Sequence, residues 1–106
     1  MRTDLLRGQL DALLLAVLAG RPLHGYAIVD ELRTRTSGEL ELAEGTLYPA
    51  LHRLERDGLL ESRWDTDAPR RRRVYALTPR GRAALSDRRA EWRGFVQAIG
   101  AVLDPA

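Results

Sequence analysis

Residues 45–60 decide the fold, and they read GTLYPALHRLERDGLL. Within this stretch Leu47, Leu51 and Leu54 stand at helical spacing and form one apolar stripe. A helix that is apolar along a single stripe buries that face and leaves the opposite face to solvent. The pattern therefore predicts a helix over about residues 46–57.

The ends of this helix are also indicated by residue type. Gly58 predicts the C-terminal end, because glycine readily takes the left-handed conformation that closes a helix. Pro49 lacks a backbone N–H and is unfavourable in a helix interior. We therefore expect Thr46 to cap the helix and Pro49 to lie in the first turn, where N–H groups have no partner within the helix.

Two further helices are expected before this one. The first should cover residues 4–19 and stop at Gly20; its apolar residues at helical spacing are Leu6, Leu10, Leu13, Leu14, Val17 and Leu18. The second should run from about His24 to Arg35, with an inward face of Ala27, Ile28 and Leu32. A long, partly acidic turn then leads to the third helix.

The remainder of the chain predicts a hairpin and a final helix. Residues 59–64 and 72–77 read as strands joined by a polar turn. Thr78 and Pro79 then start a helix that ends near Leu103, as N-cap and first helical residue. This order gives a mainly α fold with a small β hairpin: a winged helix-turn-helix, expected over residues 1–78, followed by one C-terminal dimerisation helix over 79–106 that packs with the first helix.

Charge is distributed unevenly along the 106 residues, which form one domain's length of chain. All 17 basic residues are arginine. Residues 70–93 hold nine arginines against two acids, whereas residues 39–67 are acidic. The basic end is suited to attract a polyanion. The alternative is that a GC-rich coding sequence accounts for the arginines.

Several classes of function are excluded by composition. There is no cysteine, which excludes disulfides and thiolate chemistry. The chain has two histidines and three serines, with no Gly-rich phosphate loop and no metal constellation, so we expect no enzyme, no cofactor and no metal. The longest apolar run, residues 12–20, is too short to span a bilayer, and we expect a soluble, cytoplasmic protein with no membrane partner.

Three segments carry a resemblance to a known family. They are HGY at residues 24–26, GTLYPALHRLE with GLL at residues 45–60, and RVYALT followed by Gly81 at residues 73–81. In order and spacing the chain resembles the PadR family of transcriptional regulators over about residues 8–81, and its single last helix resembles the short subfamily. The resemblance implies a homodimer that binds double-stranded DNA at a pseudo-palindromic operator, usually as a repressor.

By this resemblance the exposed face of the third helix meets DNA, through Thr46, Tyr48, Pro49, His52 and Arg53. Tyr48 has an alternative, which is to pack against the second helix. Arg53 has an alternative as well, which is to pair with Glu55 or Asp57. A metal-binding role for His52 is not expected, because only one other histidine is available.

The second helix and the wing supply further candidates. Tyr26 either contacts a phosphate or is buried with its hydroxyl satisfied. The wing carries Arg70, Arg71, Arg72 and Arg73, and alternation along a strand divides them into Arg71 with Arg73 and Arg70 with Arg72. One set should face the DNA, where a narrow minor groove attracts arginine. The alternative is a solvated edge that charge protects from aggregation.

The last helix carries an apolar stripe with no partner in so small a domain. We expect Trp92, Phe95, Val96 and Ile99 to pair with a second copy, together with Leu6 and Leu10 of the first helix. Some members of the family bind flat aromatic ligands at this interface, so the resemblance implies that Trp92 either stacks on a small aromatic effector or only packs the dimer. The alternative function is a winged-helix protein-interaction module without specific DNA binding.

Overall fold

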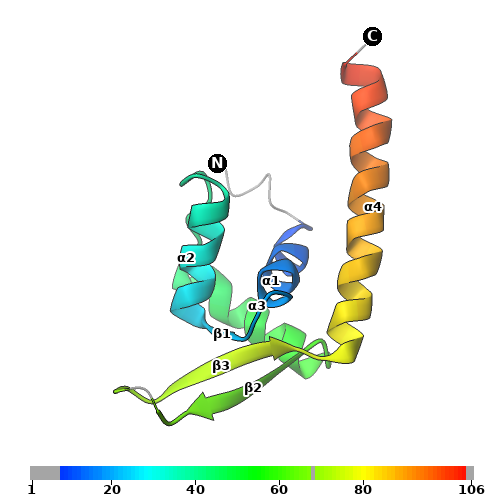
Figure 1. The fold of residues 1–106 in the computed structure, drawn as a ribbon. Helices are drawn as coiled ribbons and strands as arrows, with labels where there is room; N and C mark the ends of the chain where they lie inside the picture. The colour runs from blue at the N-terminus through cyan, green and yellow to red at the C-terminus, as the bar shows by residue number, and fades with distance from the viewer. Residues whose placement is uncertain (1–7, 68, 105–106) are drawn as a thin grey trace.

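The computed structural model describes residues 8–67 and 69–104 (Figure 1). Four helices and one antiparallel sheet follow in the order α1 (Leu10–Leu18), β1 (Leu23–His24), α2 (Gly25–Arg35), α3 (Glu44–Arg56), β2 (Leu60–Asp65), β3 (Arg72–Leu77) and α4 (Pro79–Leu103). The predicted fold class is confirmed: three helices and a hairpin form a compact body, from which α4 projects.

The first helix is shorter than predicted where the structure describes it. Gly8 and Gln9 form a turn, and α1 begins at Leu10. Gly8 has a φ of +83°, which is incompatible with helix. The rest of the expected helix, including Leu6, lies outside the described residues. The second helix begins and ends as predicted, with His24 as its N-cap.

The start of α3 differs from the prediction. Ala43, not Thr46, is the N-cap, and its carbonyl accepts from the N–H groups of Thr46 and Leu47 at 3.0 and 2.9 Å. Pro49 is therefore the sixth helical residue rather than a first-turn residue. It is tolerated because it lies on the exposed side. It withholds only one hydrogen bond, to the carbonyl of Gly45 in the exposed first turn.

The sheet has a third strand that the sequence analysis missed. β1 pairs antiparallel with β3, with Leu23 opposite Tyr75, and the strand order is β1-β3-β2. β1 has only two residues, which is too short to show the alternation of inward and outward residues by which a strand is predicted. Within the hairpin, Leu60 lies opposite Leu77 and Trp64 opposite Arg73.

The core forms where the helices meet one face of the sheet. The three leucines of the α3 stripe are at most 1% exposed, and Ile28 and Tyr75 are equally buried. Leu40 and Leu42 bury the long turn between α2 and α3 against the same cluster. The apolar stripes predicted for α2 and α3 are confirmed, and they fix which face of α3 remains outside.

The start of α4 is as predicted, with Pro79 in the first turn and the Thr78 hydroxyl accepting from the Gly81 N–H at 3.0 Å. Gly81 and Leu85 are the buried residues of this helix. Helix α4 also contacts α1, and beyond that contact it projects from the body; the molecule measures 55 × 29 × 21 Å (Figure 1). No helix within residues 8–67 and 69–104 has the length and apolar character to cross a bilayer.

Candidate nucleic-acid interface

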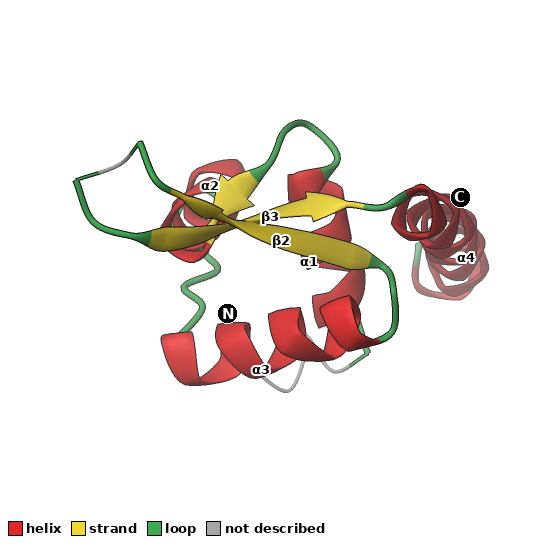
Figure 2. Cartoon of the chain, turned by 90° about the horizontal axis from the view of Figure 1, so that it is seen from below, coloured by secondary structure: helices red, strands yellow, loops and turns green. Residues whose placement is uncertain are grey.

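The outer face of α3 is polar and accessible. Thr46, Pro49, His52 and Arg53 are exposed, on the side away from the leucine stripe. Figure 2 shows α3 lying alongside the hairpin, with the wing tip reaching past it. The structure therefore brings the predicted reading residues and the predicted wing to one side of the molecule.

Tyr48 is half-buried and turns toward α2. Its hydroxyl lies so close to Gly25 that a Cβ atom there would be 2.4 Å away. Its ring is also 6.4 Å from the ring of His52. Tyr48 thus packs against α2, which was the alternative to a DNA contact. Its hydroxyl lies beside Gly25, the first residue of α2.

Arg53 pairs with an acid that the sequence analysis did not consider. Its guanidinium contacts the carboxylate of Asp11 on α1, not Glu55 or Asp57. Both side chains keep substantial exposure, 44% for Arg53 and 33% for Asp11. Exposed pairs of this kind are weak, so a DNA phosphate can compete for Arg53.

The start of α2 combines an exposed tyrosine with a histidine that caps the helix. Tyr26 is 65% exposed, which rules out the buried-ring alternative and leaves the ring accessible to a phosphate. The Ala27 N–H donates to Nδ1 of His24 at 3.4 Å, which caps the helix. Burial, and then the positive charge of Arg72, hold the pKa of His24 below its ordinary value of 6.5.

The wing is organised around Trp64, which the sequence analysis missed. The guanidinium carbons of Arg71 and Arg73 lie 4.4 and 4.9 Å from the centre of the Trp64 ring. Cations over an indole face are attracted by its quadrupole. The two arginines share a side of the wing, as strand alternation predicted. Trp64 could have been identified by aligning the two predicted strands, because their register places it directly opposite Arg73.

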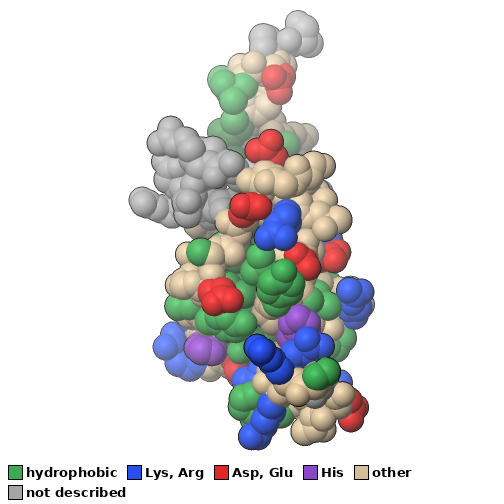
Figure 3. All heavy atoms as spheres, turned by 90° about the vertical axis from the view of Figure 1, so that its left-hand side faces the viewer, with side chains coloured by type: hydrophobic (Ala, Val, Ile, Leu, Met, Phe, Trp, Pro, Cys, Tyr) green, Lys and Arg blue, Asp and Glu red, His purple; other side chains and the backbone are tan. Residues whose placement is uncertain are grey.

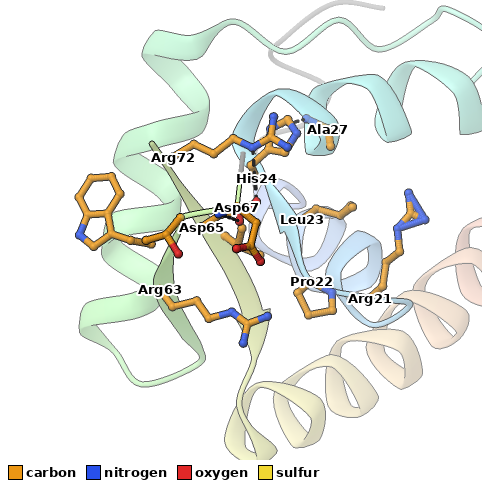
Figure 4. Close-up of a pocket in the computed structure, with 12 residues that line it drawn as sticks. Arg21, Pro22, Leu23, His24, Ala27, Arg63, Asp65, Asp67 and Arg72 are labelled. Carbon is orange, nitrogen blue, oxygen red and sulfur yellow. Dashed lines mark hydrogen bonds and ion pairs between the residues drawn. The ribbon is translucent and has the colours of Figure 1, made fainter. Parts of the chain in front are cut away.

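Of the four wing arginines, Arg71 and Arg73 lie over the Trp64 ring, whereas Arg72 and Arg70 have other surroundings. Arg72 is 3.8 Å from the Asp65 carboxylate, and both line a cavity of about 790 Å³ on the outer side of the hairpin. Figure 4 shows Arg63, Asp67 and His24 around the same cavity. Arg70 is exposed in the turn before β3. Seen from the wing-tip side, basic side chains gather at that end of the molecule (Figure 3).

A polar bridge connects α3 to the wing. The Ser62 hydroxyl donates to Glu55 of α3 at 2.6 Å, and Nε of Arg73 donates to the same hydroxyl oxygen at 2.9 Å. Burial, and then the Glu55 carboxylate, raise the pKa of Tyr75 above its ordinary value of 10.0. Sequence reasoning did not find this bridge, because it joins three separate elements.

The apolar residues predicted on the last helix are exposed in the single chain. Trp92 is 50% exposed, Phe95 56%, and the two rings stack with centroids 5.8 Å apart. Val96 and Ile99 continue the stripe, and Leu10 is partly buried against the core. Helices α1 and α4 are in contact near this point. A cavity of about 260 Å³ beside the two rings is also lined by Gln9 and Arg88.

No group of residues suited to hold a metal occurs among the described positions. An exposed helix beside a basic wing defines a winged helix-turn-helix DNA-binding protein. The chain belongs to the PadR-like family of transcriptional regulators, whose model matches residues 14–87. It is accordingly a DNA-binding regulator of transcription and not an enzyme.

Individual relatives agree with this assignment. The transcriptional regulator Rv3488 of Mycobacterium tuberculosis is 49% identical over 73 residues, which are 68% of this chain and 65% of that protein. A transcriptional regulator from Clostridium thermocellum superimposes with a TM-score of 0.86 at 31% identity, covering 92% of this chain and 96% of that one. A PadR family regulator from Eggerthella lenta gives 0.84 at 34% identity, covering 97% and 88%.

Proposed function

We propose that the chain works as a homodimer that reads a pseudo-palindromic operator and represses transcription by occupying it. This proposal rests on one observation: the exposed face of α3 and the Trp64–arginine cluster lie on the same side of the molecule. In this arrangement α3 enters the major groove and the wing reaches the neighbouring minor groove or backbone. Thr46, Pro49 and His52 face the base edges, and Tyr26 contacts phosphate from the start of α2.

Of the two sets of wing arginines, we assign Arg71 and Arg73 to DNA. Arg73 lies on the side of β3 that also carries the buried Tyr75, which is the side against α3. Arg72 points to the other side, where Asp65 offsets its charge. Arg70, in the turn at the wing tip, adds a phosphate contact.

Dimerisation is supported by the α4 stripe. Trp92, Phe95, Val96 and Ile99 are each more than 40% exposed in one chain, and Val102 and Leu103 extend the stripe at 78% and 72%. Burying such a stripe against a second copy removes apolar surface from water. A two-fold dimer would present its two α3 helices to half-sites about one turn of DNA apart, ~34 Å.

We also propose that a small, flat aromatic compound stacks on Trp92 and Phe95 as an effector. The stacked rings and the cavity beside them support this proposal. Such a compound changes DNA binding only if it favours one spacing of the two α3 helices over another. Because the target is chromosomal DNA, we place the protein in the cytoplasm.

The test is selection of duplexes from a random-sequence pool, followed by fluorescence anisotropy across a salt series. We expect an enriched palindromic sequence. Replacing Arg71 and Arg73 by alanine should lower the log–log salt slope by about 0.9 for each lost phosphate contact. Arg33→Ala with Arg35→Ala removes the same charge from the last turn of α2, which lies away from the wing and from the α4 stripe, and should leave the slope unchanged (Figure 1).

Two results would contradict the proposal. A pool without an enriched sequence would favour the protein-interaction alternative. A slope unaltered by the Arg71 and Arg73 changes would remove the wing from the interface.

A further inference from the structure

Arg73 is held by two contacts of different kinds. Its guanidinium carbon is 4.9 Å from the centre of the Trp64 ring, and its Nε donates to the Ser62 hydroxyl at 2.9 Å. Together these contacts restrain both the plane and the rotation of the guanidinium. Within the described part of the chain, no acceptor takes a hydrogen bond from its terminal amino groups. Those groups remain available to a ligand.

The Ser62 hydroxyl has a defined polarity. A hydroxyl carries one proton and two lone pairs. The Ser62 hydroxyl donates its hydrogen bond to the Glu55 carboxylate at 2.6 Å, so a lone pair of the hydroxyl oxygen faces Arg73. A carboxylate accepting from a hydroxyl makes a short, charge-assisted bond, which fixes that orientation. Ser62 and Arg73 are half-buried, so solvent does not freely replace the contact.

We propose that Ser62, fixed by Glu55, is a positioning residue that aims Arg73 of the wing at the DNA that α3 reads. The inference rests on the proposed function, because it requires Arg73 to contact DNA. The inference adds a connection between the two parts of the interface. Because Glu55 belongs to α3, the Glu55–Ser62–Arg73 hydrogen bonds fix the position of the wing arginine relative to that helix. The bases bound by α3 and the groove bound by the wing are then read at a fixed separation.

The deciding variant is Ser62→Ala, which removes the hydroxyl and leaves the net charge unchanged. Any loss of affinity for DNA is therefore not caused by a change in the long-range electrostatic attraction between protein and DNA. We expect affinity for the enriched duplex to fall about fivefold, since a hydrogen bond to a charged group is lost while the Trp64 contact remains. Ser62→Thr keeps the hydroxyl and should retain affinity. Ser86→Ala, on the exposed side of α4, is the matched control.

A double-mutant cycle separates positioning from general structural damage. In an Arg73→Ala background Ser62→Ala should change affinity by less than about 1.5-fold, because nothing remains to be positioned. A similar fall in both backgrounds would overturn the inference, and so would an unchanged affinity for Ser62→Ala when Arg73→Ala weakens binding. If the wild-type chain prefers no duplex, the proposed function itself fails. Thermal unfolding of each variant shows whether the comparison concerns folded protein.

Discussion

At the scale of single residues, Gly25 sets how closely α2 and α3 approach. A Cβ atom at this position would lie 2.4 Å from the Tyr48 hydroxyl oxygen. Gly25→Ala should therefore displace the tyrosine ring and cost about 1–2 kcal/mol of unfolding free energy. Urea denaturation measures this. Gly45→Ala is the control, because nothing lies within 4 Å of a Cβ there; equal losses for the two variants would refute the packing explanation.

His24 makes stability depend on pH. Its pKa lies below 6.5 in the folded chain, so the unfolded chain binds more protons and stability falls as pH drops below about 6.5. Protonation also removes the lone pair that accepts from the Ala27 N–H. We expect the melting temperature to decrease from pH 7.5 to pH 5.5. His24→Asn, which caps without titrating, should reduce that decrease; an equal decrease in this variant would exclude His24 as the cause.

At the scale of elements, the base of α4 depends on Gly81. A Cβ atom there would lie 2.0 Å from the carbonyl oxygen of Leu59, which is backbone and cannot turn aside. Gly81→Ala should cost more than about 2 kcal/mol in unfolding free energy, or detach α4 from the hairpin. Gly94→Ala, in an open stretch of the same helix, should instead stabilise the protein by up to ~1 kcal/mol. Urea titration of both variants measures these changes in unfolding free energy, and a loss of similar size in both would refute the role of Gly81.

The elements themselves were largely predictable, because each depends on local patterns. The leucine stripe of α3 follows from periodicity, and the Thr78–Pro79 start of α4 follows from capping. The start of α3 was not predictable. Thr46 is a good cap by residue type, but the backbone at Ala43 already supplies the first hydrogen bonds of the helix.

The connections between elements were the part that local reasoning could not reach. Asp11 and Arg53 are 42 residues apart in the chain, and no local pattern indicates that they pair. The Glu55–Ser62–Arg73 bridge likewise requires the relative placement of α3 and the hairpin. The residues of the candidate interface were thus readable by type, whereas the contacts that orient them were not.

At the scale of the whole molecule, the exposed α4 stripe leads to a prediction about assembly. Ile99→Glu places a charge in the proposed dimer contact, and we expect dimerisation to weaken at least about tenfold because the charge must be desolvated. Sedimentation equilibrium measures this, and operator affinity should fall with it. Gln97→Glu introduces the same charge nearly opposite the stripe and should leave the dimer intact. Dimers of equal strength for both variants would exclude α4 as the contact.

The shape of α4 has a consequence for how such regulators diversify. A helix of 25 residues is ~37 Å long, and here its buried residues, Gly81 and Leu85, both lie in the first two turns. It behaves as a lever: a tilt of about 10° at its base moves its far end by roughly 6 Å, close to the rise of two base pairs. In the proposed dimer, small changes where Gly81 meets Leu59 would therefore alter the spacing of the two α3 helices without changing any of the side chains assigned to the base edges.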